Sequence, residues 1–400
     1  MIKEIWGRLA AADWNNKGSV LSKQDKYDEA IKCFDEAIKL YPKFAEAWFN
    51  KGNALKAQDK YDDAIKCYDE AIRLDRKLAA AWINKGNVLS KQDKYDEAIK
   101  CFDEANRLDP KLAAARNNKG TLLGKQDKYD EAIKAYDEAI CLYPEYTEAW
   151  NNKGIALYMI GKYDEAIKCF DEAIRLYPKF ADGWFNKGFT LKAQGKYDDA
   201  ILAYDKAIRL YPKYAEAWNN KGLILMKNLG KHDEAIKSFD EAIKIYDEAI
   251  KINSNDAGAW FNKSFTLKNQ GNYEDSIKAY DKAIKLDSKF ANAWYDKGIA
   301  LYSQGKYNEA INCFDAYDEA IKAYDEAIRL DPKYAKAWNN KGLILKDRGE
   351  HDEAIKYFDK AIKLDPKYAK AWNNKGEALK ALGRTTEADA AFTKAKELGV

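Results

Sequence analysis

Small and apolar residues recur along this chain with the spacing of paired helices. Within residues 45–57 they fall at i, i+3, i+7 and i+10, one face of a helix: Ala45, Trp48, Gly52 and Leu55. Within residues 61–74 the spacing returns at Tyr61, Ala64, Tyr68, Ala71 and Leu74. A polar turn at residues 59–60 separates the two stretches. The pattern predicts an antiparallel hairpin, in which the glycine and alanine let the backbones approach and the aromatic residues fill wider spaces.

This hairpin recurs with a period of 34 residues. Trp14, Trp48 and Trp82 are 34 residues apart, and Arg116 stands midway between Trp82 and Trp150. If each repeat begins three residues before this position, residues 11–214 hold six repeats, and five more follow: 215–256, 257–290, 291–334, 335–368 and 369–400. One hairpin cannot bury both sides of its aromatic layer, so each repeat needs neighbours.

The order of residues within the repeat resembles that of a known family. All seven prolines occupy one slot just before the next repeat: Pro42, Pro110, Pro144, Pro178, Pro212, Pro332 and Pro366. The order Trp, Gly, Tyr, Ala, Phe/Tyr, Ala, Pro resembles the tetratricopeptide repeat (TPR), and the likeness recurs eleven times over residues 11–400. The resemblance implies an all-α, TPR-type α-solenoid, a right-handed superhelix of antiparallel helix pairs whose first helices line a concave groove for peptides or partner helices.

The predicted organisation is a short N-terminal capping segment (1–10), repeats 1–7 (11–256) and repeats 8–11 (257–400). Repeat 7 carries an extra heptad, which should lengthen its second helix by about 10 Å and keep its face. Repeat 9 gains ten residues, which predicts a bend or a third short helix. Slippage during duplication is the alternative explanation for both inserts.

The ninth position of the repeat changes along the chain. It is polar in repeats 1–4 and apolar in repeats 5–10, and the fifth and twelfth positions add aromatic residues and a methionine. A contiguous apolar strip predicts an interaction site, although a tightly wound superhelix burying its inner wall is the alternative. The predicted groove residues are Ile155, Tyr158, Phe185, Asn186, Phe189, Asn220, Leu223, Met226, Phe261, Asn262, Phe265, Tyr295, Ile299, Tyr302, Asn340 and Leu343.

Two polar columns accompany this strip. The sixth position is Asn in ten of eleven repeats, with Asp296 the exception. Its amide is suited either to holding a ligand backbone or to tying a helix to the neighbouring repeat. The seventh position, usually Leu in the TPR family, is Lys in all eleven repeats, and we expect its methylenes to lie on the aromatic layer with a solvated ammonium.

Charge and composition narrow the function. Lys and Arg total 68 against 65 Asp and Glu, and the net charge of +3 argues against nucleic-acid binding and against a polybasic membrane surface. No segment is apolar enough to span a bilayer or direct secretion, and six cysteines without a CxxC pair predict a soluble protein of a reducing, cytoplasmic compartment.

No residue cluster points to catalysis, a metal or a cofactor. His232 and His351 replace a packing tyrosine, far apart in the chain. Five cysteines share one position of the second helix, at the edge of its apolar face, where cysteine acts as a small hydrophobe: Cys33, Cys67, Cys101, Cys169 and Cys313. The recurring carboxylates alternate with lysines, as on a solvated outer face. We therefore expect no enzyme activity.

The sequence predicts a protein-interaction scaffold that binds a protein or peptide in its groove. The alternative is head-to-tail self-association, because Ile2, Ile5, Trp6 and Leu9 form a short apolar stripe and repeat 11 has no successor. A co-chaperone or a regulatory arm of an enzyme complex is less favoured. The TPR clamp for a C-terminal carboxylate is absent, because the fifth and sixth positions are never basic.

Overall fold

The computed structural model describes residues 2–307 and 313–398. Within these ranges the chain forms twenty-two helices and no strand, which confirms the all-α prediction. Residues cluster into two compact units, Met1–Leu210 and Tyr211–Val400. We call them the N-terminal and C-terminal units and describe each by itself.

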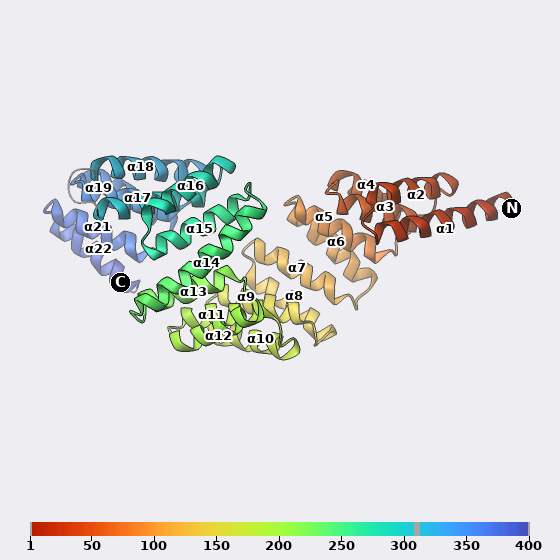
Figure 1. Ribbon diagram of the computed structural model, residues 1–400, viewed down its shortest axis with the longest axis horizontal. Coiled ribbons are helices and arrows are strands. Elements are labelled where there is room, and N and C mark those ends of the chain that lie inside the picture. Colours follow the sequence, from red (N-terminus) through yellow and green to blue (C-terminus); the bar gives the residue numbers. More distant parts are fainter. Residues whose placement is uncertain (1, 308–312, 399–400) are drawn as a thin grey trace. The chain divides into compact units, whose positions relative to one another are not determined.

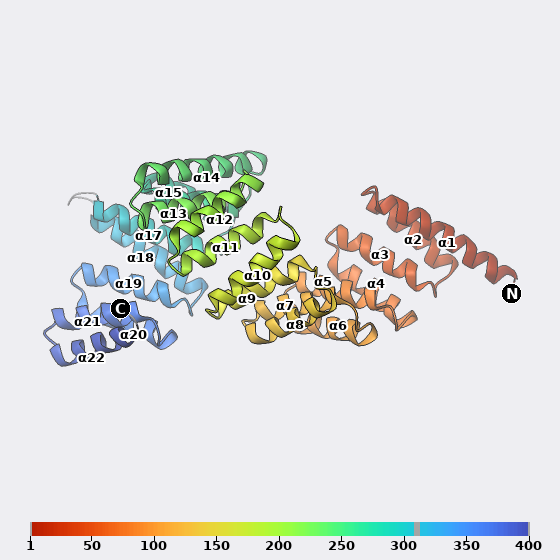
Figure 2. The ribbon, with the colours of Figure 1, turned by 90° about the horizontal axis from the view of Figure 1, so that it is seen from below.

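The N-terminal unit contains six helix pairs, drawn from red to lime in Figures 1 and 2. Its helices are α1 (Ile2–Ser22), α2 (Tyr27–Leu40), α3 (Ala45–Ala57), α4 (Tyr61–Leu74), α5 (Ala79–Lys91), α6 (Tyr95–Leu108), α7 (Ala113–Lys125), α8 (Tyr129–Leu142), α9 (Thr147–Met159), α10 (Tyr163–Leu176), α11 (Ala181–Ala193) and α12 (Tyr197–Leu210). Each helix packs on the one before it, as both views show.

The C-terminal unit continues this arrangement with helices of less uniform length. Its helices are α13 (Ala215–Lys227), α14 (His232–Ile252), α15 (Ala257–Gln270), α16 (Tyr273–Leu286), α17 (Ala291–Tyr307), α18 (Cys313–Leu330), α19 (Ala335–Asp347), α20 (His351–Leu364), α21 (Ala369–Ala381) and α22 (Thr385–Glu397). The extra heptad gives α14 21 residues, and Phe239 and Tyr246, seven residues apart, are both buried. The bend or third helix expected in repeat 9 falls partly on residues 308–312, outside the described residues.

In ten of the repeats an aromatic ring of the second helix lies over a glycine of the first helix, and in repeat 8 Ser264 takes the place of the glycine. In repeat 2, a Cβ added to Gly52 would lie 2.7 Å from Cε1 of Tyr68, a distance that real side chains do not tolerate. Tyr68 has no exposed surface, and Ala64 beside it is also fully buried. The glycine of the repeat therefore makes room for the ring of the second helix.

The turn between paired helices requires a left-handed residue, and the chain supplies it in two ways. The N-terminal repeats use an aspartate, as at Asp59 with φ 57°, while repeat 5 uses Gly161 with φ 78°. The aspartate also accepts a hydrogen bond from the next tyrosine, since Tyr61 Oη lies 2.7 Å from Asp59 Oδ1. This local bond helps a non-glycine residue to hold an unusual backbone angle.

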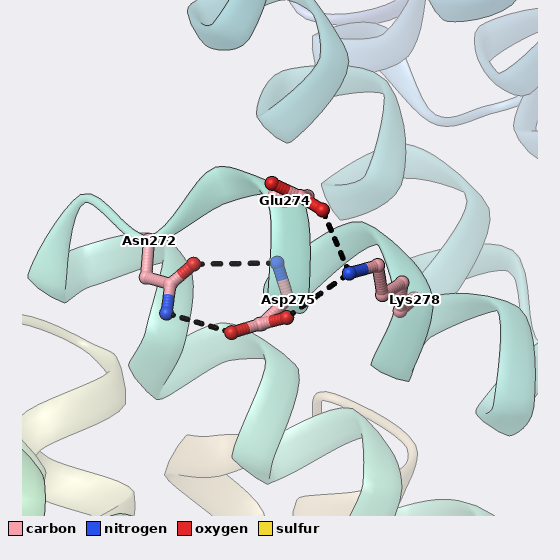
Figure 3. Close-up of polar contacts among 4 residues, drawn as sticks. All are labelled: Asn272, Glu274, Asp275 and Lys278. Atoms are coloured by element: carbon pink, nitrogen blue, oxygen red, sulfur yellow. Dashed lines mark hydrogen bonds and ion pairs between the residues drawn. The ribbon is translucent and has the colours of Figure 1, made fainter.

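In repeat 8 the second helix has a side-chain cap (Figure 3). Asn272 Oδ1 accepts a hydrogen bond from the backbone N–H of Asp275 at 3.3 Å, and Asn272 Nδ2 donates to Asp275 Oδ2 at 3.0 Å. Lys278 Nζ lies 2.7 Å from Glu274 Oε1 and 3.3 Å from Asp275 Oδ1. These contacts fix the first turn of α16 at the helix surface.

Lysines of the seventh position join successive repeats within each unit. Lys51 Nζ lies 2.6 Å from Asp35 Oδ1 on the preceding repeat and 5.7 Å from the ring of Trp48. The contact recurs with the pairs Lys85–Asp69, Lys119–Asp103, Lys153–Asp137, Lys187–Asp171, Lys263–Asp247, Lys297–Asp281, Lys341–Asp325 and Lys375–Asp359. The ammonium, which we expected to be solvated, is paired with a carboxylate and lies over the tryptophan ring.

Candidate functional site between α9 and α11

Five of the predicted groove residues come together in one cavity of the N-terminal unit. Its volume is about 220 Å³, and its walls come from α9, α10 and α11. The lining side chains are Ile155, Tyr158, Met159, Phe170, Phe185, Asn186, Phe189 and Thr190. We call this cavity the α9–α11 pocket.

Aromatic rings form most of the pocket wall. The ring of Phe189 lies 5.3 Å from that of Tyr158 on the preceding repeat and 6.2 Å from that of Phe185 on its own helix. Lys192 Nζ lies 5.3 Å from the centre of the Phe189 ring. These contacts hold the rings in place and put one positive charge at the pocket edge.

The mouth of the pocket exposes aliphatic surface. Ile155 is 40% exposed and Met159 is 52% exposed, while Phe170 and Thr190 are buried. The remaining predicted side chains of the pocket are half-buried. The arrangement is an apolar recess with two exposed apolar side chains in its lining.

The sixth-position asparagines tie neighbouring repeats together. Asn186 Nδ2 donates to Asn151 Oδ1 at 2.9 Å, and Asn152 Nδ2 donates to Asn117 Oδ1 at 3.1 Å. The same link occurs early in the chain, where Asn50 Nδ2 donates to Asn15 Oδ1 at 3.0 Å. The tying role holds at these positions, and contact of Asn186 with a ligand remains a prediction.

A buried hydroxyl beneath the pocket residues lacks a partner. Tyr68 Oη donates to Asn53 Oδ1 at 2.9 Å in repeat 2. In repeat 6 the position of Asn53 is taken by Phe189, and the buried Tyr204 hydroxyl has no hydrogen-bond partner within the described part of the chain. Burial also raises the pKa of Tyr204 above its ordinary value. The apolar ninth position therefore leaves one polar group unsatisfied.

In the C-terminal unit the predicted groove residues are half-buried, and several of their rings pack on neighbouring aromatic rings. They are Asn220, Leu223, Met226, Phe261, Asn262, Phe265, Tyr295, Ile299, Tyr302, Asn340 and Leu343. The rings of Phe261 and Phe290 are 4.8 Å apart, and those of Tyr295 and Tyr334 are also 4.8 Å apart. Asn340 Nδ2 donates to Tyr295 Oη at 3.0 Å. This pattern agrees with the alternative of an inner wall that buries itself.

The single aspartate of the asparagine column forms an ion pair in this unit. Asp296 accepts a hydrogen bond from Lys268, whose ammonium also lies 4.5 Å from the ring of Phe265. Burial raises the pKa of Asp296 and lowers the pKa of Lys268. The substitution of Asp for Asn is therefore matched by a lysine at the twelfth position of the preceding repeat.

Four cysteines are buried, whereas Cys141 and His232 are exposed and His351 is half-buried. Cys33, Cys67, Cys101 and Cys169 are buried thiols, and burial raises the pKa of the last three to about 11. Among the side chains that the structure describes, no group of three or more His, Cys, Asp and Glu residues is placed to hold a metal ion. The side chain of Cys313 lies outside the described residues.

Sequence reasoning missed part of the pocket. Met159 is at the thirteenth position and Phe170 on the second helix, neither of which was expected to face the groove. The available signal was a large apolar residue at Met159, where repeats 1–4 have Lys23, Ala57, Lys91 and Lys125. The pocket depends on how α10 packs against α9, and the periodic sequence pattern does not specify this packing.

Comparisons with known families agree with the repeat structure. A tetratricopeptide repeat model matches residues 15–79, 117–181 and 185–250, and another matches 77–145. Further TPR models match residues 245–278, 266–305, 315–347, 335–368 and 357–390. The chain therefore belongs to the tetratricopeptide repeat family, whose fold supports protein–protein interaction and whose members are typically non-enzymatic scaffolds.

Solved structures of other TPR proteins resemble parts of the chain. YrrB, described as a TPR protein with an unusual peptide-binding site, is 29% identical and has a TM-score of 0.40, covering 47% of this chain and 97% of its own. MamA is 26% identical with a TM-score of 0.39, covering 41% and 96%. Pseudomonas aeruginosa PilF is 20% identical with a TM-score of 0.46, covering 52% and 94%. No curated protein sequence matches the chain significantly.

No described helix is both long enough and apolar enough to cross a membrane.

Proposed function

We propose that this protein is a non-enzymatic scaffold that holds a peptide or partner helix by inserting an apolar side chain into the α9–α11 pocket. The observation that supports this most directly is the accessible rim of Ile155 and Met159 around an aromatic recess. A contiguous apolar patch on a charged surface is a common mark of an interaction site.

The size of the pocket favours a side chain over a free small molecule. Its volume of about 220 Å³ is below the roughly 300–1,000 Å³ typical of small-molecule sites. An apolar side chain buried against Phe185 and Phe189 would gain about 25 cal/mol for each Å² removed from water. Asn186 at the pocket wall is positioned for a polar contact with the backbone of the bound segment.

The test is selection of a displayed random peptide library on the intact protein, followed by affinity measurements on variants. Phe189→Asn introduces the residue found at this position in repeats 2 and 3, so the fold should tolerate it. Peptides bound in the pocket should carry a bulky apolar residue. Their affinity for the Phe189→Asn protein should be about tenfold or more lower than for the unchanged protein, since one large apolar contact is worth roughly 1.5–3 kcal/mol. The matched control is Phe265→Asn, the same change in repeat 8. Full affinity of every selected peptide for the Phe189→Asn protein would refute the pocket assignment.

Head-to-tail self-association is a second candidate, and one observation favours it. Trp6 is 68% exposed and Leu9 is 56% exposed on α1, while the side chains of Ile2 and Ile5 lie outside the described residues. A contact between the apolar residues of α1 in one chain and the last repeat of another chain would be heterologous. Repetition of this contact would produce a fibre or a closed ring. Light scattering over a wide concentration range, with and without residues 1–10, tests this. A strict monomer in both cases excludes it.

A further inference from the structure

A second recess lies on the opposite side of α11 from the α9–α11 pocket. Its volume is about 930 Å³, and it lies between α10 and α12 over Trp184 and Leu191 of α11. Successive helical residues are separated by 100°, so Trp184, Lys187 and Leu191 share one side of α11, while Phe185 and Phe189 share another. We call this recess the α10–α12 crevice.

The floor of the crevice is apolar and includes an unusual leucine. Leu202 of α12 is 62% exposed, although leucine is normally a core residue. The corresponding position of the five preceding repeats is always lysine: Lys32, Lys66, Lys100, Lys134 and Lys168. With Trp184 and Ile167 beside it, Leu202 extends an apolar surface on which a partner side chain can lie.

A second substitution on α12 changes the charge of the crevice. Lys206 replaces the glutamate found in the five preceding repeats: Glu36, Glu70, Glu104, Glu138 and Glu172. In repeat 2 that glutamate pairs with an arginine three residues later, Arg73 with Glu70 at 2.8 Å. In repeat 6 the equivalent Arg209 instead donates to the backbone oxygen of Asp205 at 3.3 Å. The change removes the carboxylate that pairs with the arginine of the same helix and adds a positive charge to α12.

Three lysines around the crevice have no protein counter-ion. Lys168, Lys196 and Lys206 line it, and their ammonium groups make no hydrogen bond or ion pair within the described ranges. Lys187 is paired with Asp171 at 2.6 Å, and two carboxylates, Asp164 and Asp199, also line the crevice. Four lysines against two aspartates give the lining a formal charge of +2.

The equivalent crevice of repeats 3 and 4 lacks these features. Its volume is about 280 Å³, and Arg116 stands there in place of the tryptophan. Its charged lining is balanced, with three basic residues (Arg116, Lys119 and Lys134) against three acidic ones (Asp103, Glu131 and Glu138). Arg116 is itself paired with Glu138 at 3.1 Å. The equivalent crevice of repeats 7 and 8 also has a lining charge of +2, with Lys282 at the position of Lys206, but its volume is about 460 Å³ and Lys278 takes the place of the leucine. The larger volume and the exposed leucine are thus particular to repeats 5 and 6 among these three crevices.

We propose that the α10–α12 crevice binds an acidic peptide segment, with an apolar side chain on Leu202 and Trp184 and carboxylates paired with Lys168, Lys196 and Lys206. Charge complementarity selects the acidic partner, and the exposed leucine selects one with an apolar residue. A nucleic-acid strand fits less well, because Asp164 and Asp199 would repel a continuous phosphate backbone and the lining offers a single aromatic ring, Trp184, for base stacking. This site is separate from the α9–α11 pocket and does not depend on it.

The experiment uses a set of short fluorescein-labelled synthetic peptides, measured by anisotropy on the full chain. Each peptide has one central Leu, Ile, Phe or Trp flanked by Asp and Glu, and matched sets replace the acidic residues with Lys or the apolar residue with Ser. The test variant, Leu202→Lys with Lys206→Glu, installs the residues that repeat 5 carries at these positions, Lys168 and Glu172. Leu202→Ser serves as a second, smaller change, and circular dichroism confirms that both variants fold.

The acidic apolar peptides should bind the unchanged protein, and this binding should weaken at high salt. In the double variant their affinity should fall roughly tenfold or more. Phe189→Asn should leave this binding unchanged, so that failure of the α9–α11 proposal and failure of this one are distinguishable. Equal binding of the lysine-containing peptides, or full affinity in both Leu202 variants, overturns the proposal. Tighter binding of a single-stranded oligonucleotide that the double variant abolishes also overturns it, in favour of a polyanion site.

Discussion

The ammonium of Lys153 lies 2.6 Å from Oδ1 of Asp137, and the same ammonium lies 5.6 Å from the ring centroid of Trp150. The lysine therefore joins the first helix of one repeat to the second helix of the preceding repeat while covering the tryptophan of its own helix. Because the same pair recurs along both units, a position that is usually apolar in the TPR family here carries an electrostatic link between repeats.

We predict that this link contributes measurably to stability. A double-mutant cycle with Lys153→Met and Asp137→Asn should give a coupling free energy of about 0.5–1 kcal/mol at low salt, less at high salt. The control is the more exposed pair Lys66–Asp63 on one helix, whose coupling should be smaller. Urea midpoints of the variants provide the measurement. Equal coupling in the two cycles would show that the inter-repeat geometry adds nothing.

The two glycines of α7 should respond in opposite ways to alanine. A Cβ on Gly120 would lie 2.7 Å from Cε1 of Tyr136, whereas a Cβ on Gly124 would have no heavy atom within 4 Å. Gly120→Ala should destabilise by about 1–3 kcal/mol through overpacking. Gly124→Ala should stabilise by roughly 0.5–1 kcal/mol, because alanine has the higher helix propensity. Thermal and urea unfolding of the two variants give the sign of each change in stability. A loss of stability in both variants would contradict the packing argument.

Replacing the buried tyrosine by phenylalanine should affect stability differently in repeats 2 and 6. Tyr204→Phe removes an unsatisfied hydroxyl and places the residue found in repeats 1, 3 and 5, so we expect stability to stay level or rise by about 1 kcal/mol. Tyr68→Phe removes the hydrogen bond to Asn53 and should cost about 1 kcal/mol. Unfolding midpoints of the two variants are compared under one condition. A destabilised Tyr204→Phe protein would mean that its hydroxyl has a partner in solution.

The repeat boundaries and helix faces were predictable because they depend on periodicity. The spacing of Trp48, Gly52 and Tyr68 places a ring against a glycine in ten of the eleven repeats, and the helices begin and end close to the expected residues. A 34-residue period repeated eleven times leaves few alternative arrangements of helices.

The sites were less predictable because they depend on departures from the period. Leu202 is visible as an exception in its column and Lys206 as a change from the glutamate of repeats 1–5, but the site that they form depends on the crevice between α10 and α12. Likewise the apolar strip extends over repeats 5–10, yet a pocket with an exposed rim forms beside Ile155, while Phe261 and Tyr295 pack against other rings. Which apolar side chains remain accessible is decided by neighbouring side chains, not by helix phase.

The buried tyrosines predict how stability depends on alkaline pH. Burial raises the pKa of Tyr68 and of Tyr204 above 10, the ordinary value that the unfolded chain retains. Below pH 10 both states hold the phenolic proton, so the two residues add no pH dependence. As pH rises above 10 the unfolded chain loses these protons while the folded chain keeps them, and the free energy of unfolding falls by about 1.4 kcal/mol per pH unit for each tyrosine.

Tyr204→Phe should therefore make the fall in stability above pH 10 shallower by about 1.4 kcal/mol per pH unit, and Tyr68→Phe should do the same. The two variants differ in stability at neutral pH for the reasons given above, but this change in slope should be common to both. Urea unfolding followed by circular dichroism between pH 9 and the onset of alkaline unfolding gives the slopes, with the unchanged protein measured alongside. If the slope for either variant equals that of the unchanged protein, the phenol removed in that variant ionises as readily in the folded protein as in the unfolded chain. That tyrosine is then not buried against its glycine in solution.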